Sequence, residues 1–148
     1  MARSRICSPG KAGVGSPRRF SVPVTITTGV ITVRICLVIT ELDPGGAERA
    51  LVQLACGLQE RNIDVFVVSL KPLPHSSRRQ LVDQLDEQGI PITSLEIRNR
   101  LAFLRGAAAL RDLLDTYQPD LVHSFLHHAN ILCAMSWHRQ QPWKLVAG

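Results

Sequence analysis

The sequence Ile31-Thr-Val-Arg-Ile-Cys-Leu-Val-Ile-Thr40, followed by Glu41-Leu-Asp-Pro-Gly-Gly-Ala-Glu48, decides the fold. The first segment is a nearly continuous run of apolar and β-branched residues, which is typical of a strand that is covered on both faces. Residues 47–62 then repeat apolar residues at helical spacing, which predicts a helix with one buried face. The apolar positions of this helix are Ala47, Ala50, Leu51, Leu54, Ala55 and Leu58.

The same alternation of strand-like and helix-like segments continues along the sequence. Further strands are predicted at residues 64–70, 92–97, 121–126 and 143–147, and further helices at 77–88, 101–117 and 127–139. The buried face expected for the helix at 101–117 consists of Leu101, Leu104, Ala108, Leu113 and Leu114. We expect Ser76 or Ser77 to cap the helix at 77–88.

This order, β-α-β-α-β-α-β-α-β, predicts an α/β fold with a doubly wound, Rossmann-like parallel sheet. Helical crossovers of this length join parallel strands through right-handed connections. We expect the strand order 3-2-1-4-5, which places a topological switch between the first and fourth strands. Because ligands bind beyond the carboxyl ends of the strands at such a switch, residues 41–46 and 125–130 are the candidate binding loops.

The length of 148 residues suits one domain, and the formal net charge is +5. Five of the 17 basic residues and none of the 12 acidic residues fall within residues 1–30, so the rest of the chain is electrically balanced. We therefore expect a disordered basic extension at 1–30 and a folded domain at 31–148. The charge does not favour a nucleic-acid partner, because it lies in an extension without aromatic interleaving. Arg18-Arg19 loosely resembles an export signal, but threonines and Arg34 interrupt the apolar stretch that such a signal requires.

The glycine pair Gly45-Gly46 is the first candidate binding site. Glycine lets a ligand approach the backbone closely, and the helix that follows offers free N–H groups and a positive dipole end to an anion such as a diphosphate. Glu48 falls in the first turn of that helix, where a carboxylate is electrostatically favourable. The alternative is a tight turn with Asp43 as a local cap. The loop has neither G-x-G-x-x-G spacing nor a P-loop lysine, so neither of those nucleotide sites is supported.

Polar residues also gather around the end of the fourth predicted strand. His123 lies within the strand, and His128 and Asn130 follow it, so these side chains are candidates to hydrogen-bond a sugar hydroxyl or a phosphate. The alternatives are a core position for His123 and helix capping by the other two. The segment Arg98-Asn-Arg100 follows the third strand, and it is either a contact for an anionic lipid or substrate phosphate or a solvated loop.

The four cysteines show no metal or redox spacing such as C-x-x-C. We interpret Cys36, Cys56 and Cys133 as buried thiols of a protein in the reducing cytosol. The sequence also contains no Gly-x-Ser-x-Gly elbow and no other nucleophile constellation. These residue patterns therefore predict no metal site.

Two segments together resemble a known family. Asp43-Pro-Gly-Gly-Ala-Glu-Arg49, after the first strand, resembles the G-G-x-E loop of family 4 glycosyltransferases. The segment Gln118–Asn130, which reads QPDLVHSFLHHAN, is similar to their PDLVHSH…HAN segment. The resemblance runs from about residue 31 to residue 148 and includes the alternation of strands and helices between the two motifs.

The resemblance implies the amino-terminal, acceptor-side half of a GT-B enzyme, in which two Rossmann-like domains face a cleft. Such enzymes transfer a sugar from a nucleotide-sugar donor to a glycan or lipid-linked acceptor in cell-surface polysaccharide synthesis, most of them without a metal or other cofactor. It places Gly45 and Gly46 against the donor diphosphate and the acceptor, and His123 near the transferred sugar. His128 and Asn130 match the HAN part, whereas Phe125 replaces the second histidine of the H-x-H pattern.

The family's carboxy-terminal domain, with its E-x7-E glutamates, has no counterpart in this sequence. We therefore expect this chain to be inactive alone and to need that domain, or a split-gene partner, for transfer. The expected location is the cytoplasm, peripheral to the inner face of the membrane. The alternative function is a non-catalytic Rossmann-like module that binds a partner or a phosphorylated ligand.

Overall fold

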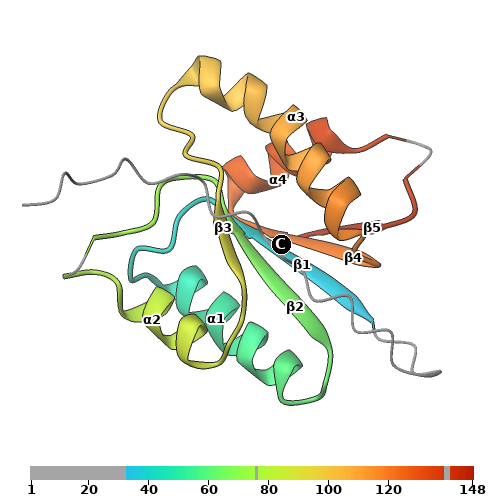
Figure 1. Ribbon diagram of the computed structural model, residues 1–148. Coiled ribbons are helices and arrows are strands. Elements are labelled where there is room, and N and C mark those ends of the chain that lie inside the picture. Colours follow the sequence, from blue (N-terminus) through green and yellow to red (C-terminus); the bar gives the residue numbers. More distant parts are fainter. Residues whose placement is uncertain (1–32, 76, 139–140) are drawn as a thin grey trace, which may run out of the picture. The chain divides into compact units, whose positions relative to one another are not determined.

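Strands and helices alternate strictly in the computed structural model, which describes residues 33–75, 77–138 and 141–148. In chain order the elements are β1 (Arg34–Ile39), α1 (Gly46–Gln59), β2 (Asp64–Ser69), α2 (Gln80–Glu87), β3 (Ile92–Ser94), α3 (Arg100–Tyr117), β4 (Leu121–Phe125), α4 (His127–Ser136) and β5 (Lys144–Ala147). The expected β-α alternation is therefore confirmed (Figure 1). The extension predicted at 1–30 lies outside the described residues.

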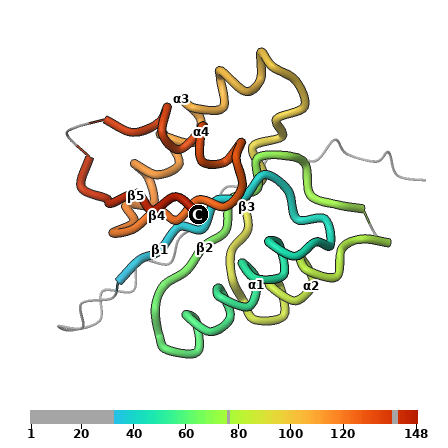
Figure 2. Tube along the Cα trace, turned by 180° about the vertical axis from the view of Figure 1, so that it is seen from behind, coloured from blue at the N-terminus to red at the C-terminus, as the bar shows by residue number. Residues whose placement is uncertain are grey.

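The strands form one parallel sheet in the order β3-β2-β1-β4-β5, as expected from the sequence. In the centre of the sheet, Ile35 pairs with Val65 of β2 on one side and with Leu121 of β4 on the other. Helices α1 and α2 cover one face of the sheet, and α3 and α4 cover the other (Figures 1 and 2). The strand order reverses between β1 and β4, so the carboxyl ends of these two strands flank the switch point.

The two faces of β1 explain its apolar sequence. Cys36 and Val38 point to the core under α3 and α4, whereas Leu37 and Ile39 point to the core under α1 and α2. These side chains are fully buried. Because alternate residues of a strand face opposite sides, a strand between two helical layers must be apolar at every position.

The buried face of α3 differs from the prediction. Leu101 and Leu104 are 74% and 62% exposed, and Ala108 is also exposed. Leu114 is fully buried and Leu113 packs against the core, as predicted, and the core is also reached by Leu110, Gly106 and Ala107. At 3.6 residues per turn, Leu101 lies about 180° and Leu104 about 120° around the helix from Leu110. The helix therefore carries two apolar stripes, of which only one packs on the sheet.

Three smaller predictions were also wrong. Ala50 and Leu54 of α1 are exposed, because its buried stripe runs through Leu51, Val52 and Ala55.

Helix α2 begins three residues later than expected, with Arg79 rather than Ser77 at its N-cap. Ser76 lies outside the described residues. The Arg79 side chain instead donates hydrogen bonds to Asp83 and Asp86 on the helix, at 2.8 and 2.9 Å.

Strand β3, which was expected to run to residue 97, ends at Ser94, because Glu96 adopts a left-handed conformation with φ = 54°.

The phase of α3 gives a test of the fold. Leu110→Ala should lower the free energy of unfolding by about 2–5 kcal/mol, because it opens a cavity in a fully buried cluster. Leu104→Ala, on the same helix, should change it by less than about 0.5 kcal/mol, because that side chain is largely exposed. Denaturant unfolding measures both values. Equal losses in the two variants would contradict the assigned face.

Candidate functional site

The loop between β1 and α1 ends at two glycines that have different structural roles. Gly45 is the N-cap of α1, and its backbone is extended with φ = −145°. The buried Glu48 carboxylate lies directly over it, and a Cβ at residue 45 would overlap this carboxylate. Gly46 has open space around the position of a Cβ, and its φ is not positive. A Cβ at position 45 would therefore displace the end of the Glu48 side chain, whereas the fold gives no reason for glycine at position 46.

The first turn of α1 presents backbone N–H groups that no helical carbonyl accepts. No side chain in the described part of the chain caps them at the Gly45 position. The first helical bond runs from the Arg49 N–H to the Gly45 carbonyl, at 3.2 Å. Together with the helix dipole, these free groups make the loop suitable for an anion, as the sequence predicts.

His123 lies inside β4, two residues before the end of the strand. It pairs with Leu37 of β1 and Val146 of β5, and its ring stacks on Phe125 with a centroid distance of 4.3 Å. His123 shares a sheet face with Phe125, which packs against the core under α1 and α2. Burial lowers the pKa of His123 below its ordinary value, because desolvation disfavours the charged form. A neutral imidazole can both donate and accept a hydrogen bond.

The residues after β4 separate into different environments. Asn130 is tied to the main chain at Gly148, to which its Nδ2 donates a hydrogen bond of 2.8 Å. His128 instead lines a cavity that is bounded by α3 and α4. Leu126, the N-cap of α4, has φ = 71° and ψ = 154°, a backbone conformation that residues other than glycine rarely adopt. The predicted residues therefore do not form one cluster: Gly46 and His123 belong to the α1 side, and His128 to the other.

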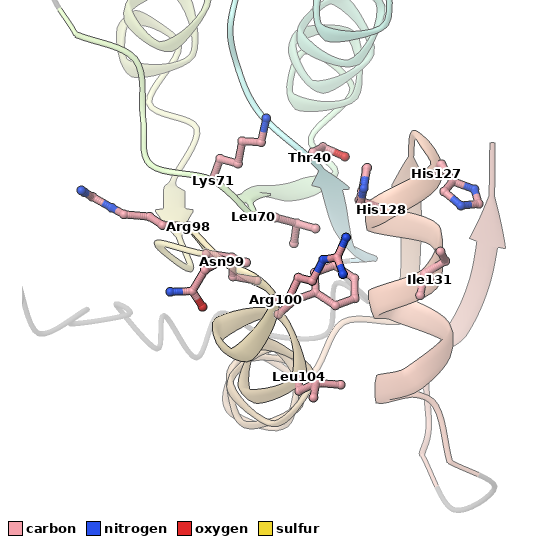
Figure 3. A pocket seen from close by; sticks show the side chains of 12 residues that line it. Thr40, Leu70, Lys71, Arg98, Asn99, Arg100, Leu104, His127, His128 and Ile131 are labelled. Carbon is pink, nitrogen blue, oxygen red and sulfur yellow. The ribbon is translucent and has the colours of Figure 1, made fainter.

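The cavity beside His128 has a volume of about 570 Å³ (Figure 3). It opens beyond the carboxyl ends of β1 and β2, between the first turns of α3 and α4. Its lining residues are Thr40, Leu70, Lys71, Ile97, Arg98, Asn99, Arg100, Phe103, Leu104, His127, His128 and Ile131. Sequence analysis singled out Arg98-Asn-Arg100 and His128, but it missed Thr40 and Lys71, which carry no motif.

Two of the basic residues at this cavity already have acidic partners. Lys71 Nζ lies 2.7 Å from a Glu41 carboxylate oxygen. Arg98 lies 3.0 Å from Glu96, and this ion pair lowers the pKa of the Glu96 carboxyl. Arg100 forms no ion pair with any residue that the structure describes. The cavity therefore carries an uncompensated positive charge at the start of α3.

The described cysteines are free and have no sign of reactivity. Burial raises the pKa of Cys133 to about 12, and it raises that of Cys36 well above the usual range. Within the described residues, no three His, Cys, Asp or Glu side chains gather as a metal site would require. None of the helices in the described part of the chain is both long and apolar enough to span a bilayer.

A family model matches most of the chain. The model of the family described as Glycosyltransferase Family 4 matches residues 44–148, which include Gly45, Gly46 and the segment after β4. No curated protein matches the chain in sequence.

Solved structures share the fold. A glycosyltransferase from Rickettsia africae matches 80% of this chain with a TM-score of 0.59 and 18% sequence identity. MurG from Acinetobacter baumannii matches 78% of this chain with a TM-score of 0.56 and 14% sequence identity. The chain spans about a third of those two proteins, covering 30% and 34% of them. The C-terminal domain of a hydrogenase from Pyrococcus furiosus has a TM-score of 0.53 and 13% sequence identity, and the match covers 82% of this chain and 97% of that domain. Likeness at this level shows the fold alone.

The unequal roles of the two glycines can be tested by stability. Gly45→Ala should lower the free energy of unfolding by up to about 1 kcal/mol, because the flexible end of the Glu48 side chain must move aside. Gly46→Ala should leave it unchanged or raise it by up to about 1 kcal/mol, because alanine favours helix and the space is open. Thermal unfolding measures both. Gly45→Ala in a Glu48→Ala background is the control, and there the penalty should disappear. A penalty at position 46 as large as that at 45 would contradict the assignment.

Proposed function

This chain belongs to Glycosyltransferase Family 4, and we propose that it is the acceptor-side half of an enzyme that transfers a sugar from a nucleotide-sugar to a glycan or lipid-linked acceptor. The observation that carries the proposal is Gly46, a glycine that the fold does not require at the start of a helix whose N–H groups are uncapped. A ligand that packs against the backbone at this point explains why a side chain is absent.

In the proposed reaction, the bond between the sugar and the nucleotide diphosphate breaks, and negative charge grows on the departing diphosphate. The first turn of α1 stabilises this charge through its free N–H groups and its dipole. Glu48 folds back over Gly45, so the side of the turn at Gly46 stays open for the diphosphate. The same open side admits the acceptor.

His123 lies on the same face of the sheet as α1, and burial lowers its pKa, which favours the neutral imidazole. We assign it a hydrogen bond to a hydroxyl of the transferred sugar. Phe125, which stacks on His123, replaces the second histidine of the family pattern. Its ring offers an apolar surface to the sugar instead of a hydrogen bond. On the other face, we assign His128 and Asn130 to the edge of the ligand site, where Asn130 holds the main chain at Gly148.

The donor's nucleotide is assigned to a second domain. The chain covers about a third of the two solved glycosyltransferases, so most of their length has no counterpart here. In our proposal a carboxy-terminal domain, in a longer product or in a split-gene partner, binds most of the nucleotide-sugar. No metal or other cofactor takes part. The reaction belongs to cell-surface polysaccharide synthesis and takes place in the cytoplasm, at the inner face of the membrane.

Position 46 is the test of this assignment. Gly46→Val should reduce sugar transfer at least about 100-fold, because the side chain occupies the space proposed for the diphosphate. Gly57→Val is the matched control, since Gly57 lies on the same helix and also has open space around it. It should retain transfer within about twofold. The assay follows label from UDP-glucose, UDP-N-acetylglucosamine and GDP-mannose into acceptor in extracts of producing cells. Equal activity of the two variants would refute the role of Gly46.

A second prediction concerns the isolated chain. The purified 148-residue protein should turn over none of these three nucleotide-sugars, because our proposal assigns the nucleotide to a second domain. Release of nucleoside diphosphate, measured by chromatography, reports turnover. Release above the rate of the protein-free solution would show that the chain needs no second domain. A protein that binds partners but gives no transfer in any producing-cell extract would favour the non-catalytic module.

A further inference from the structure

We propose that the cavity between the first turns of α3 and α4 binds a phosphate group that is attached to an apolar chain. None of residues 41–49 lines this cavity, so it is separate from the glycine loop at the start of α1. The inference goes beyond the proposed transfer step and rests on the proposed function only in that His128 borders both sites. It rests on a buried hydroxyl, an uncompensated charge, two helix N-termini and an apolar wall.

Thr40 is the first observation that points to a ligand. The residue is only 8% exposed, and its Oγ1 is buried without a hydrogen-bond partner among the described residues. Thr40 follows β1 directly and lines the cavity, with its oxygen near the end where Lys71 and His128 lie (Figure 3). A buried hydroxyl without a partner is unfavourable for folding. A phosphate oxygen in the cavity would accept the hydrogen bond that Thr40 lacks.

The charge of the cavity indicates a single anionic group. Figure 3 shows the guanidinium of Arg100 reaching toward the cavity, whereas Arg98 and Asn99 point away from it. Lys71 and Arg98 are each compensated by an acidic partner, but Arg100 is not compensated by any residue that the structure describes. A guanidinium binds phosphate well because its planar donors match two phosphate oxygens.

Two helix N-termini open on the same cavity. Helix α3, with 18 residues, is capped by Asn99, whose side chain accepts a hydrogen bond of 2.8 Å from the Ala102 N–H. Helix α4, with ten residues, begins after Leu126 and has no side-chain cap. The free N–H groups at the start of α4, next to His128, are thus available to an anion. Both dipoles favour negative charge at this point.

The remaining lining residues are apolar and define the other part of the ligand. Leu70 and Ile97 are buried in the floor, and Phe103 is half-buried above them. Leu104 and Ile131 are 62% and 38% exposed at the edge of the cavity. A free phosphate or a sugar phosphate would leave these side chains in water. An alkyl chain would cover them, which is favourable by the hydrophobic effect.

The first experiment compares three phosphates on the full chain by calorimetry and by amide chemical shifts. Inorganic phosphate, glucose 1-phosphate and hexyl phosphate share the anion but differ in what it carries. Hexyl phosphate should bind roughly tenfold more tightly than either other probe, because its chain removes apolar surface from water. Its largest shifts should fall at residues 40, 100 and 128. Tighter binding of glucose 1-phosphate, or shifts centred on residues 45–48, would overturn the proposal.

Variants separate ligand binding from folding. Arg100→Gln should lower the affinity for hexyl phosphate about tenfold or more, because it removes the uncompensated charge. Arg105→Gln is the matched control on the same helix, since Arg105 does not line this cavity, and it should leave the affinity within about twofold. Leu104→Ser should lower the affinity for hexyl phosphate and leave the affinity for inorganic phosphate unchanged. Equal effects of Arg100→Gln and Arg105→Gln would show surface charge attraction only, which contradicts a site.

Thr40→Val gives a signature that a purely structural role would not produce. It should lower the affinity for hexyl phosphate about fivefold, because the hydrogen bond to the anion is lost. The same substitution should raise the melting temperature of the free protein by several degrees, because it removes a buried hydroxyl that has no partner. A lower melting temperature together with unchanged affinity would show that Thr40 serves the fold and not a ligand.

Discussion

The structure depends on the burial of β1 between two helical layers. Its residues from Cys36 to Ile39 are completely removed from water, and they contribute alternately to the core under α3 and α4 and to the core under α1 and α2. Because both faces are apolar, β1 must occupy the centre of the sheet. The strand order then reverses beside it, and the loops that follow β1 and β4 meet at one edge. The position of every candidate residue follows from this arrangement.

The same two layers divide the functional residues. The glycine loop and His123 belong to the side of α1, whereas Thr40, Arg100 and His128 belong to the side of α3 and α4. The last residues of β1 and β4 reach both sides, because alternate side chains point in opposite directions. Both of the proposed anion sites thus lie at one edge of a single sheet. In the proposed reaction the first serves the departing diphosphate, and the second is free for a separate phosphate-bearing group.

Sequence reasoning predicted the order of the elements and the strand order, because long apolar runs and helical periods persist whatever the packing. It placed Leu114 in the core correctly but joined it with Leu101 and Leu104 and missed Leu110, since all of these leucines fall at helical spacings. Periodicity cannot choose between two stripes; the position of the helix over the sheet does. Sequence also found both glycines at positions 45 and 46 but could not separate them, because only the carboxylate of Glu48, folded over Gly45, makes their difference visible.

Each edge of the sheet holds a buried polar atom without a described partner, Gln141 Nε2 in the loop before β5 and Thr40 Oγ1 after β1. At the amino edge, the Tyr117 hydroxyl donates a hydrogen bond of 2.9 Å to Asp64, and burial with this partner raises the pKa of the tyrosine. At the carboxyl edge, Thr40 has no described partner, Leu126 adopts a strained left-handed conformation, and Gly46 leaves a space unfilled. A sequence that served only the fold would place Val, Gly and Ala at these positions, because each is more favourable there. Three such departures gather at the carboxyl edge beside the candidate residues, where a ligand would make the missing contacts in the complex.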